Sequence, residues 1–294
     1  MTKKRIITKK KIIKLPVYFL LIIFAIIFAL PFYWSILTSI RPNDQIITPT
    51  VSFFVHNPTI EHYVKVFTTI PFAEYIWNTS VITAMLMATN LVFCTLAGYA
   101  FAKLEFAGKN LVYKLMTLSM MLPAVVMIVP QFLVIARLPL FGGNNILGQG
   151  GKGLVGSFFG VVAPTAISVF NIFFMRQYYL STPDDVADAA RIDGANEFQV
   201  FFHIYVPMAS PAVATLAVFC FQAGWNSFLW PVIVLQGSKT RVLTQGLQAF
   251  SFNNSMDYGP TMAASIMITI PILIVYIFAQ KYFVQGIALS GIKE

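Results

Sequence analysis

Uncharged, mostly apolar blocks alternate with polar segments along the chain, and six of the blocks are long enough to cross a lipid bilayer. A membrane-spanning helix needs about 20 mainly apolar residues. The six blocks are Leu15–Leu37, Tyr75–Ala102, Leu115–Ala136, Leu154–Met175, Val206–Leu235 and Thr261–Gln280. The pattern predicts an all-α integral membrane protein with six transmembrane helices.

Composition and charge support the same class. Hydrophobic residues make up 57% of the 294 residues and charged residues only 11%, whereas soluble domains contain about 25% charged residues. The net charge of +9 could indicate a nucleic-acid partner. The basic residues flank the apolar blocks, however, which suits anionic lipid headgroups. We therefore expect a lipid bilayer around the chain and no nucleic acid.

The first apolar block is predicted to remain in place as transmembrane helix 1. It follows seven Lys and Arg in residues 1–14, and it is longer than the apolar region of a signal peptide, which is about 7–15 residues. The predicted divisions are a basic N-terminus (1–14), helix 1 (15–37), an extracytoplasmic segment (38–74), a transmembrane core (75–280) and a C-terminal tail (281–294).

The basic residues also predict which side each loop faces. If the N-terminus is cytoplasmic, residues 1–14, 103–114, 176–205 and 281–294 carry 7, 3, 2 and 2 Lys and Arg, which leaves six on the outer side. Cytoplasmic loops carry the excess of Lys and Arg. Both termini and the segment 176–205 are therefore predicted to be cytoplasmic.

The connector 176–207, between the fourth and fifth blocks, is unusual because it is both charged and helix-competent. Thr182 and Pro183 are typical of an N-cap and a first helical residue, and Asp193-Gly194 is typical of a helix end. A second, amphipathic helix is predicted from Asn196. Connectors this long are usually functional or disordered, and the patterning here favours a functional loop.

The same connector resembles a known motif. Asp188-Ala189-Ala190, then Gly194 after three residues, then Ile204 and Pro207, is similar to the "EAA" loop of permease subunits of binding-protein-dependent ABC importers. The longer run from Ala189 through Asp193-Gly194-Ala195 looks like the carbohydrate-uptake branch. Asp188 stands where Glu is usual, which keeps the negative charge on a shorter side chain.

The resemblance implies a role for the chain and a set of partners. The chain would be the membrane-spanning permease subunit of an ATP-driven importer in a bacterial or archaeal cell membrane, forming half of the path for a sugar or oligosaccharide. Its partners would be a second homologous permease, two ATPase subunits and an extracytoplasmic binding protein. The chain itself would hold no cofactor, since ATP and Mg²⁺ would bind to the ATPase subunits.

The resemblance also implies site residues. The loop at 176–207 would be the coupling element that docks on an ATPase. The residues implied in that contact are Asp185, Asp188, Ala189, Ala190, Asp193, Gly194, Ala195, Ile204 and Pro207. The C-terminal run from Gln280 is similar to permease tails that reach the ATPases, which makes Gly286 and Gly291 predicted contact positions.

The apolar blocks contain no Asp, Glu, Lys, Arg or His. Proton-driven transporters generally use intramembrane ionisable groups as relays, so a proton-coupled carrier is disfavoured. A sodium-driven carrier remains an alternative, because backbone carbonyls can bind that ion. The sequence shows no catalytic constellation and no metal-ligand set, so we expect neither an enzyme nor a metal site.

Polar residues within the blocks predict a substrate path. Amide side chains beside aromatic rings suit a sugar, because amides bind hydroxyl groups and rings pack on the apolar face of the sugar. The predicted path residues are Gln222, Trp225, Asn226, Phe228, Trp230, Asn90 and Gln131. Interhelical packing and interfacial anchoring are the alternative interpretation of the same residues.

The sequence also predicts the structure of two outer segments, and it leaves several alternative functions open. Arg41–Glu74 is predicted to have irregular backbone, and the glycine-rich Phe141–Gly153 is predicted to be a flexible loop. Besides a sugar importer, the sequence leaves open an importer for another solute, such as a polyol, glycerol phosphate or an amino acid. A self-sufficient secondary carrier and a non-transporting scaffold also stay open.

Overall fold

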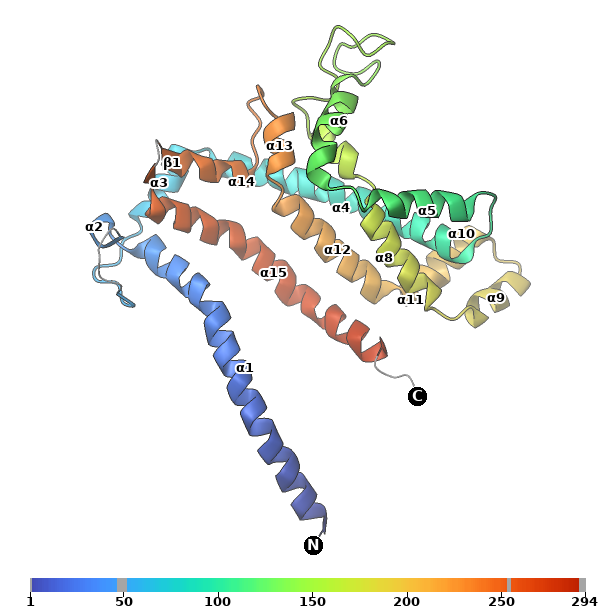
Figure 1. Cartoon of the computed structure of the whole chain (residues 1–294), viewed down its shortest axis with the longest axis horizontal. Coiled ribbons are helices and arrows are strands. Elements are labelled where there is room, and N and C mark those ends of the chain that lie inside the picture. Colours follow the sequence, from blue (N-terminus) through green and yellow to red (C-terminus); the bar gives the residue numbers. More distant parts are fainter. Residues whose placement is uncertain (1, 47–51, 253–254, 291–294) are drawn as a thin grey trace. The chain divides into compact units, whose positions relative to one another are not determined.

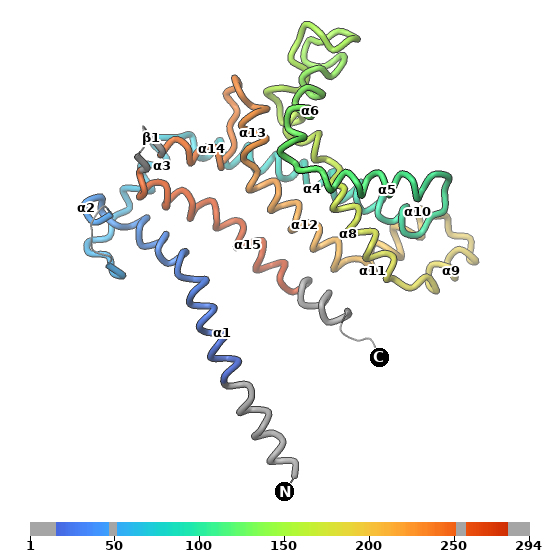
Figure 2. Tube along the Cα trace, in the orientation of Figure 1, coloured from blue at the N-terminus to red at the C-terminus, as the bar shows by residue number. Residues whose placement is uncertain are grey.

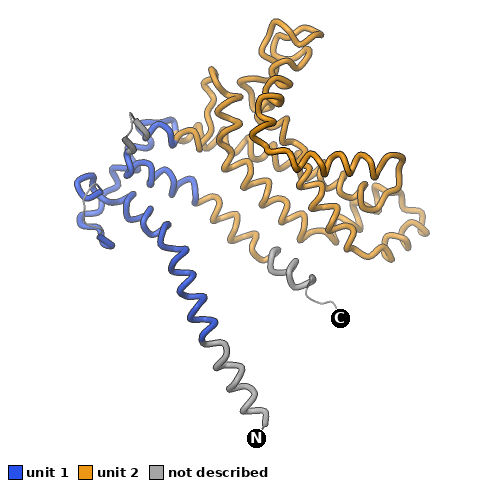
Figure 3. Tube along the Cα trace, viewed as in Figure 1, with its two compact units in different colours: residues 1–71, 247–269 blue, residues 72–246, 270–294 orange. Residues whose placement is uncertain are grey.

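The structure is a computed structural model that describes residues 2–46, 52–252 and 255–290, with side chains described for residues 16–46, 52–250 and 257–281. Helices dominate the described residues (Figures 1 and 2). The chain divides into two compact units (Figure 3), residues 1–71 with 247–269 and residues 72–246 with 270–294.

The first unit is built around the N-terminal helix. Its elements are α1 (Thr2–Ile40), α2 (Asn43–Ile46), α3 (Glu61–Thr69), the short helix η3 (Leu247–Phe250), the two-residue antiparallel strands β1 (Ser251–Phe252) and β2 (Ser255–Met256), and the start of α15 (Tyr258–Ser290). The helix α3 was not expected in a segment predicted to be irregular. Its His62 is buried and contacts the carbonyl of Arg41 at 2.7 Å, and Lys65 pairs with Asp257 at 2.5 Å.

The second unit contains the remaining helices. They are α4 (Phe72–Lys103), α5 (Lys109–Ser119), α6 (Ala124–Ala136), α7 (Phe158–Val162), η1 (Ala163–Thr165), α8 (Val169–Leu180), α9 (Asp185–Ile192), α10 (Glu197–Val200), the π-helical turn η2 (Phe201–Tyr205), α11 (Val206–Met208), α12 (Ser210–Trp225), α13 (Leu229–Val234), α14 (Leu243–Gly246) and the end of α15.

The helix α4 is the central element of this unit, and α8 and α12 pack along it. Two glycines make these contacts close. A Cβ atom on Gly98 of α4 would lie 2.6 Å from the Met175 side chain of α8, and one on Gly224 of α12 would lie 2.9 Å from Thr83 of α4. Small residues let membrane helices approach in this way. The buried core continues along α4, α8 and the segment 200–220.

The predicted blocks correspond to straight and bent helices. Pro16–Ile40, Phe72–Lys103 and Tyr258–Lys281 are long and apolar enough to cross a membrane. Three helix pairs pass the same test together but are bent, by 110° between α5 and α6, by 45° before α8 and by 80° before α12. The chain has six spans if each bent pair is one span, so the count of six stays a prediction.

Proline residues lie at all three bends, and Pro207 and Pro211 flank the one before α12. Pro123 precedes α6, and Pro164 lies in η1 just before α8. A proline lacks the N–H group that would continue a helical hydrogen-bond ladder. The backbone groups freed at such a break need other partners inside a membrane, and the break before α8 obtains them from a single asparagine, as described below.

Candidate functional site

The coupling loop, residues 176–207, folds as two short helices joined at a glycine corner. Ala187 on α9 is fully buried and fixes this helix to the core. Gly194 has a φ of +89°, which a residue with a side chain rarely adopts. Asn196 then caps α10, because its side chain accepts a hydrogen bond from Gln199 N while the Gln199 side chain binds Asn196 N. The predicted corner and second helix are present.

The predicted start of the first helix is wrong. The helix begins at Asp185, and Thr182 does not cap it. The Thr182 hydroxyl instead donates to Tyr178 O at 3.1 Å, and its carbonyl accepts a hydrogen bond from Lys103 Nζ at 2.8 Å. Lys103 lies at the end of α4. Thr182, which was expected to cap the first helix of the loop, therefore joins the loop to α4 instead.

Five residues fasten the coupling loop to α4, and we call them the clamp: Tyr99, Lys103, Asp184, Glu197 and Tyr205. Lys103 Nζ lies 2.5 Å from the Asp184 carboxylate, which also accepts a hydrogen bond from the Tyr205 hydroxyl. The Tyr99 hydroxyl donates to Glu197 at 2.5 Å. Hydrogen bonds to charged groups are stronger than neutral ones, so the clamp holds both ends of the loop.

The clamp favours the ionised form of both carboxyl groups. The hydrogen bond from Lys103, and then that from Tyr205, lowers the pKa of Asp184 below its usual value. The hydrogen bonds from Arg191, and then from Tyr99, lower the pKa of Glu197 in the same direction. Both groups are partly exposed, so water weakens these interactions relative to a buried pair.

Aromatic packing supports the clamp from within. The rings of Tyr99 and Tyr205 are 5.1 Å apart, and both contact the ring of Tyr179, at 6.0 Å and 5.9 Å respectively. Tyr179 and Tyr205 are fully buried. Aromatic pairs at such distances add to the free energy gained by burying their surface, so α4, α8 and the π-helical turn form one packed unit under the loop.

The predicted coupling residues divide between the surface and the core. Asp185, Asp188, Ala189, Asp193, Gly194 and Pro207 are exposed, and Ala190, Ala195 and Ile204 are half-buried against the core. The Asp188 carboxylate has a basic partner within this chain. It contacts Arg191 of this chain at 2.7 Å, and Arg191 also binds Glu197 at 2.8 Å.

The loop also exposes apolar side chains that the sequence prediction missed. The exposed fraction is 86% for Ile192, 71% for Phe198, 56% for Val186 and 55% for Phe202. Apolar residues of this size rarely cluster on a free surface. The π-helical turn buries Phe201 and leaves Phe202 exposed.

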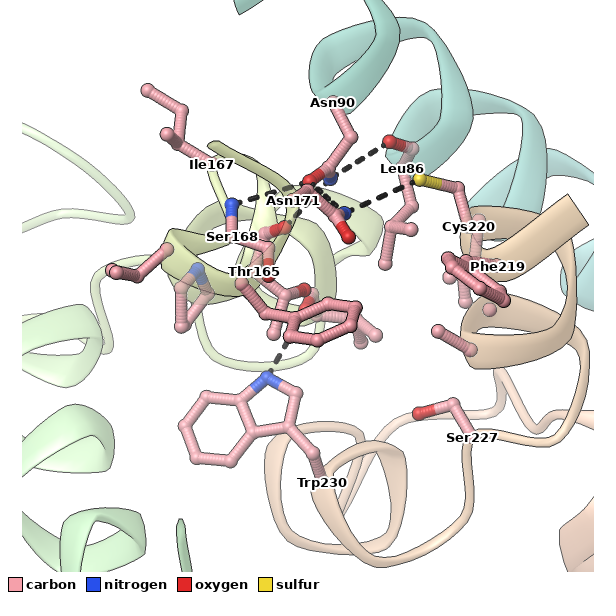
Figure 4. Close-up of a pocket in the computed structure, with 17 residues that line it drawn as sticks. Leu86, Asn90, Thr165, Ile167, Ser168, Asn171, Phe219, Cys220, Ser227 and Trp230 are labelled. Carbon is pink, nitrogen blue, oxygen red and sulfur yellow. Dashed lines mark hydrogen bonds between the residues drawn. The ribbon is translucent and has the colours of Figure 1, made fainter. Parts of the chain in front are cut away.

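A cavity of about 540 Å³ opens beside α4 about three turns from the clamp. Its lining comes from α4, α7, η1, α8, α12 and the segment up to Trp230. In Figure 4, Asn90 of α4 lies against Ser168 and Asn171, and Trp230 lies on the facing side. The volume is typical of a site for a small molecule.

Asn90 joins α4 to the break before α8. Its side chain is fully buried and donates to Thr165 O at 2.8 Å and to Leu86 O at 3.0 Å. Its carbonyl oxygen accepts from Ser168 N at 3.1 Å and from Asn171 Nδ2 at 2.9 Å. Asn90 thus binds the backbone groups that the break at Pro164 leaves free.

The cavity offers hydrogen-bonding groups without charge. Asn171, Ser168 and Ser227 line it, and its lining contains no Asp, Glu, Lys, Arg or His. The indole of Trp230 is fixed by hydrogen bonds from Nε1 to Gly160 O and Val161 O, at 3.2 and 3.1 Å. An uncharged lining with fixed aromatic faces suits a neutral polyhydroxy compound better than an ion.

The predicted path residues do not form one group. Asn90 and Trp230 line the cavity, and Gln131 lines a separate cavity of about 340 Å³ at α6. Gln222, Asn226 and Phe228 are exposed elsewhere, and Trp225 is buried. Ser168 was missed as a path residue, although a polar residue just after Pro164 in an apolar block was a usable signal.

The comparison with known families decides the identity of the chain. The family described as "Binding-protein-dependent transport system inner membrane component" matches residues 94–289. The chain belongs to this family. It is therefore a permease component of a transport system and a multi-pass protein of the cell membrane.

Two relatives and one solved structure show what the permease is similar to. The arabinooligosaccharides permease AraQ of Halalkalibacterium halodurans is 30% identical over 92% of each chain. The lactose permease LacG of Rhizobium radiobacter is 30% identical over 94% of this chain and 95% of the relative. A bacterial ABC transporter involved in the import of the acidic polysaccharide alginate matches at 26% identity, with a TM-score of 0.75 over 94% of this chain and 98% of the other.

The two predicted tail contacts fall at the C-terminal end of the chain. Gly286 falls within the described backbone of α15, in a stretch whose side chains are not described, and Gly291 lies outside the described residues. The described residues include no group of three or more His, Cys, Asp or Glu placed to hold a metal ion. The predictions on the tail and on cofactors stay predictions.

Proposed function

We propose that this permease forms one half of the membrane path of an ATP-driven importer and that the coupling loop docks on a separate ATPase subunit. The observation that carries the proposal is the clamp, which fastens an exposed loop to the helix that holds Asn90 at the cavity. The exposed apolar side chains of α9 and α10 supply the docking face. A second permease, a second ATPase subunit and an extracytoplasmic binding protein complete the importer.

The clamp supports a mechanical role for α4. A load on α9 reaches Lys103 through Asp184 and reaches Tyr99 through Glu197. The helix α4 then carries it about 14–20 Å to Asn90, at 1.5 Å per residue. Because Asn90 holds the break before α8, movement of α4 would shift the wall of the cavity. ATP binding on the ATPase subunits would in this way switch the path from open to the cytoplasm to open to the outside.

The cavity and the relatives together support an uncharged saccharide as the substrate. The two relatives are named for the transport of arabinooligosaccharides and lactose, which are neutral. The similar solved transporter is described as involved in the import of an acidic polysaccharide. An anionic group in a membrane path needs a cation or many donors to replace its water. The lining of this cavity contains no cationic side chain, so a neutral oligosaccharide fits this half of the path.

The charge distribution supports an orientation with both termini and the coupling loop in the cytoplasm. Fourteen of the 20 Lys and Arg then lie inside, as the positive-inside rule requires. ATP and Mg²⁺ would bind on the ATPase subunits, and this chain would catalyse no reaction. The coupling loop would lie between the fourth and fifth of six spans.

Uptake by the complete importer in proteoliposomes tests the proposal. Gly194→Val should abolish uptake of neutral oligosaccharide while leaving membrane insertion intact, because valine rarely adopts the backbone conformation of the corner. Gly108→Val is the matched control. Gly108 has a similar φ of +81°, and an added Cβ meets no atom within 4 Å at either glycine. Gly108, however, lies outside the coupling loop.

Each result has a distinct meaning. Loss of uptake in Gly194→Val with retention in Gly108→Val supports docking through the loop. Normal uptake in both variants contradicts it. Uptake by the permease alone would establish a self-sufficient carrier, and uptake of an acidic oligosaccharide in place of a neutral one would overturn the substrate class but not the docking role.

A further inference from the structure

The side-chain amide of Asn90 has only one orientation that satisfies its neighbours. Its Nδ2 lies 3.0 Å from Leu86 O and 2.8 Å from Thr165 O, and a carbonyl oxygen can only accept a hydrogen bond. Its Oδ1 lies 3.1 Å from the backbone nitrogen of Ser168, which can only donate. Exchanging the two ends of the amide would set acceptor against acceptor and donor against donor. The oxygen of Asn90 therefore faces the start of α8.

This orientation fixes a second amide, that of Asn171 on α8. Asn171 lies against the Asn90 oxygen, and an oxygen binds only a donor, so Asn171 must present its nitrogen there. Its Nδ2 donates to Asn90 Oδ1 at 2.9 Å and to Cys220 Sγ at 3.5 Å. Only 8% of the Asn171 surface is exposed. The nitrogen of Asn171 is therefore committed to partners within the protein.

The oxygen of Asn171 remains available to a ligand. No hydrogen bond within the described part of the chain uses Asn171 Oδ1, since both bonds of this side chain start at Nδ2. Asn171 lines the cavity of about 540 Å³, and Figure 4 shows its oxygen directed away from Asn90. A carbonyl oxygen that loses water and gains no donor costs free energy. A solute that displaces water from this cavity therefore has to supply a donor.

The other polar groups of the cavity are less selective. Ser168 and Ser227 also line it, and their hydrogen bonds to other described residues use backbone groups. A free hydroxyl group can rotate and either donate or accept, whereas an amide oxygen can only accept. The indole N–H of Trp230 already donates to two backbone carbonyls. Asn171 therefore presents the fixed requirement among these groups.

We propose that Asn171 is a specificity-determining residue, whose oxygen accepts a hydrogen bond from a hydroxyl group of the saccharide and disfavours a solute that offers only acceptors there. The inference rests on the proposed function and adds the residue that selects within the substrate class. A carboxylate at this point would set two acceptors against each other in a largely apolar cavity. Sites built to bind a hydroxyl group strongly reject analogues that lack it.

A purely structural role of Asn171 predicts a different result. In that case the residue would act only through its bond to Asn90, which helps to hold the break before α8. A substitution would then reduce the uptake of every saccharide by the same factor. Selectivity between saccharides that differ in one hydroxyl group therefore separates the two roles.

The test measures uptake by the complete importer, with its binding protein, in proteoliposomes. The probe is lactose or arabinotriose, whichever the wild type takes up, together with its singly deoxyfluoro derivatives. Fluorine replaces a hydroxyl group with little change of size and has no hydrogen to donate. Each sugar is supplied at a concentration that saturates the binding protein, and the ratio of parent to derivative uptake is compared between variants, so that the preference of the binding protein cancels.

The variants are Asn171→Ser and Asn171→Leu. Serine replaces an oxygen that only accepts by a hydroxyl group that can also donate, and leucine removes the acceptor at a similar size. The matched control is Asn226→Ser, because Asn226 is an exposed asparagine outside the lining of the cavity.

We expect the wild type to take up at least one deoxyfluoro derivative about tenfold more slowly than the parent sugar. Asn171→Ser should reduce that ratio about threefold or more. Asn171→Leu should lower uptake of the parent sugar and reduce the ratio as well, whereas Asn226→Ser should keep the wild-type ratio. These results together support the inference.

Three other results overturn it. Uptake of every derivative at the parent rate by the wild type shows that no hydroxyl group is recognised, and this result needs no variant that folds. An unchanged ratio in both Asn171 variants, with uptake of all sugars reduced alike, assigns a purely structural role. Unchanged uptake of all sugars in both variants shows that the solute does not contact Asn171. Failure of the proposed function would differ from all of these, because even the wild type would take up neither parent sugar.

Discussion

The helix α4 is joined to its neighbours by different chemistry at the clamp and at the cavity. At the coupling loop, ion pairs and charge-assisted hydrogen bonds link Lys103 to Asp184 and Tyr99 to Glu197. At the cavity, the neutral amide of Asn90 binds both sides of the break before α8. Charged groups are tolerated where water is near, and a neutral amide avoids burying a charge within the membrane.

The difference has consequences for mutation. Water can replace part of a lost bond at the partly exposed clamp, so changes there should affect coupling more than folding. Asn90 is fully buried, and its side chain has partners on both helices. Changes at Asn90 should therefore affect folding first.

Asn90→Leu should give the largest effect. The substitution keeps the approximate size of the side chain and leaves Thr165 O and Ser168 N without their partner. Buried groups left unpaired cost about 1–3 kcal/mol each, so we expect a loss of about 2–6 kcal/mol in the free energy of unfolding. Thermal unfolding in detergent measures it, with the exposed Asn226→Leu as control. Equal stability of the two variants would contradict the assigned role of Asn90.

Lys103→Met should come second, with uptake reduced about tenfold, which corresponds to about 1.4 kcal/mol. It removes the link to Asp184 and to Thr182 O but keeps the length of the side chain. Uptake and ATP hydrolysis should be measured together, and hydrolysis should continue while uptake falls.

Lys109→Met is the matched control for this prediction. Lys109 also binds a carbonyl and a carboxylate, those of Leu104 and Glu105, at 2.7 and 2.9 Å. It lies outside the coupling loop, so its loss should leave uptake unchanged. Equal effects of the two lysine variants would show that the clamp has no special role.

Tyr205→Phe should give a smaller change. It removes one hydrogen bond to Asp184 and keeps the aromatic packing. A hydrogen bond to a charged group contributes about 1.5–3 kcal/mol when buried, and partial exposure should reduce the effect to about two- to fivefold in uptake. The effect should vanish in an Asp184→Ala background, which removes the acceptor, whereas that of Tyr99→Phe should persist there. Persistence of the Tyr205→Phe effect would disprove the pairing.

The smallest effect should come from pH. Because the pKa values of Asp184 and Glu197 are lowered from their usual values of 3.8 and 4.5, the clamp is complete above pH 4.5. Its contribution is lost as pH falls through the lowered pKa values. Hydrogen exchange in residues 185–200, corrected for the intrinsic effect of pH, should lose protection there, while residues 160–175 should not. Loss of protection in both segments at the same pH would indicate general unfolding.

The sequence predicted what depends on local pattern. The block Tyr75–Ala102 corresponds to α4 within three residues, because a long apolar run without proline leaves little choice of structure. Gly194 and Asn196 were predicted as a helix end and a helix start from their own backbone and capping preferences, and the structure has both features.

The sequence could not predict contacts between distant residues. Tyr99 and Glu197 are 98 residues apart, and Lys103 and Asp184 are 81 apart, so no periodicity links them. Proline predicted that the chain would bend but not in which direction. The run from Gln222 to Trp230 was treated as one group, whereas α12 ends at Trp225 and directs the later residues elsewhere. The predicted roles of these residues therefore depend on an arrangement that only the fold supplies.

Cross-linking from a single cysteine tests the central claim most directly. Native Cys94 and Cys220 are buried, so an introduced cysteine would react alone with a maleimide–amine cross-linker. Ile192→Cys lies on α9 at a position with 86% exposure, and Ile146→Cys, with 78% exposure, lies in the segment between α6 and α7. In the assembled importer, we predict that Ile192→Cys joins to the ATPase subunit and Ile146→Cys does not. An ATPase product from Ile146→Cys, or none from Ile192→Cys, would contradict the account.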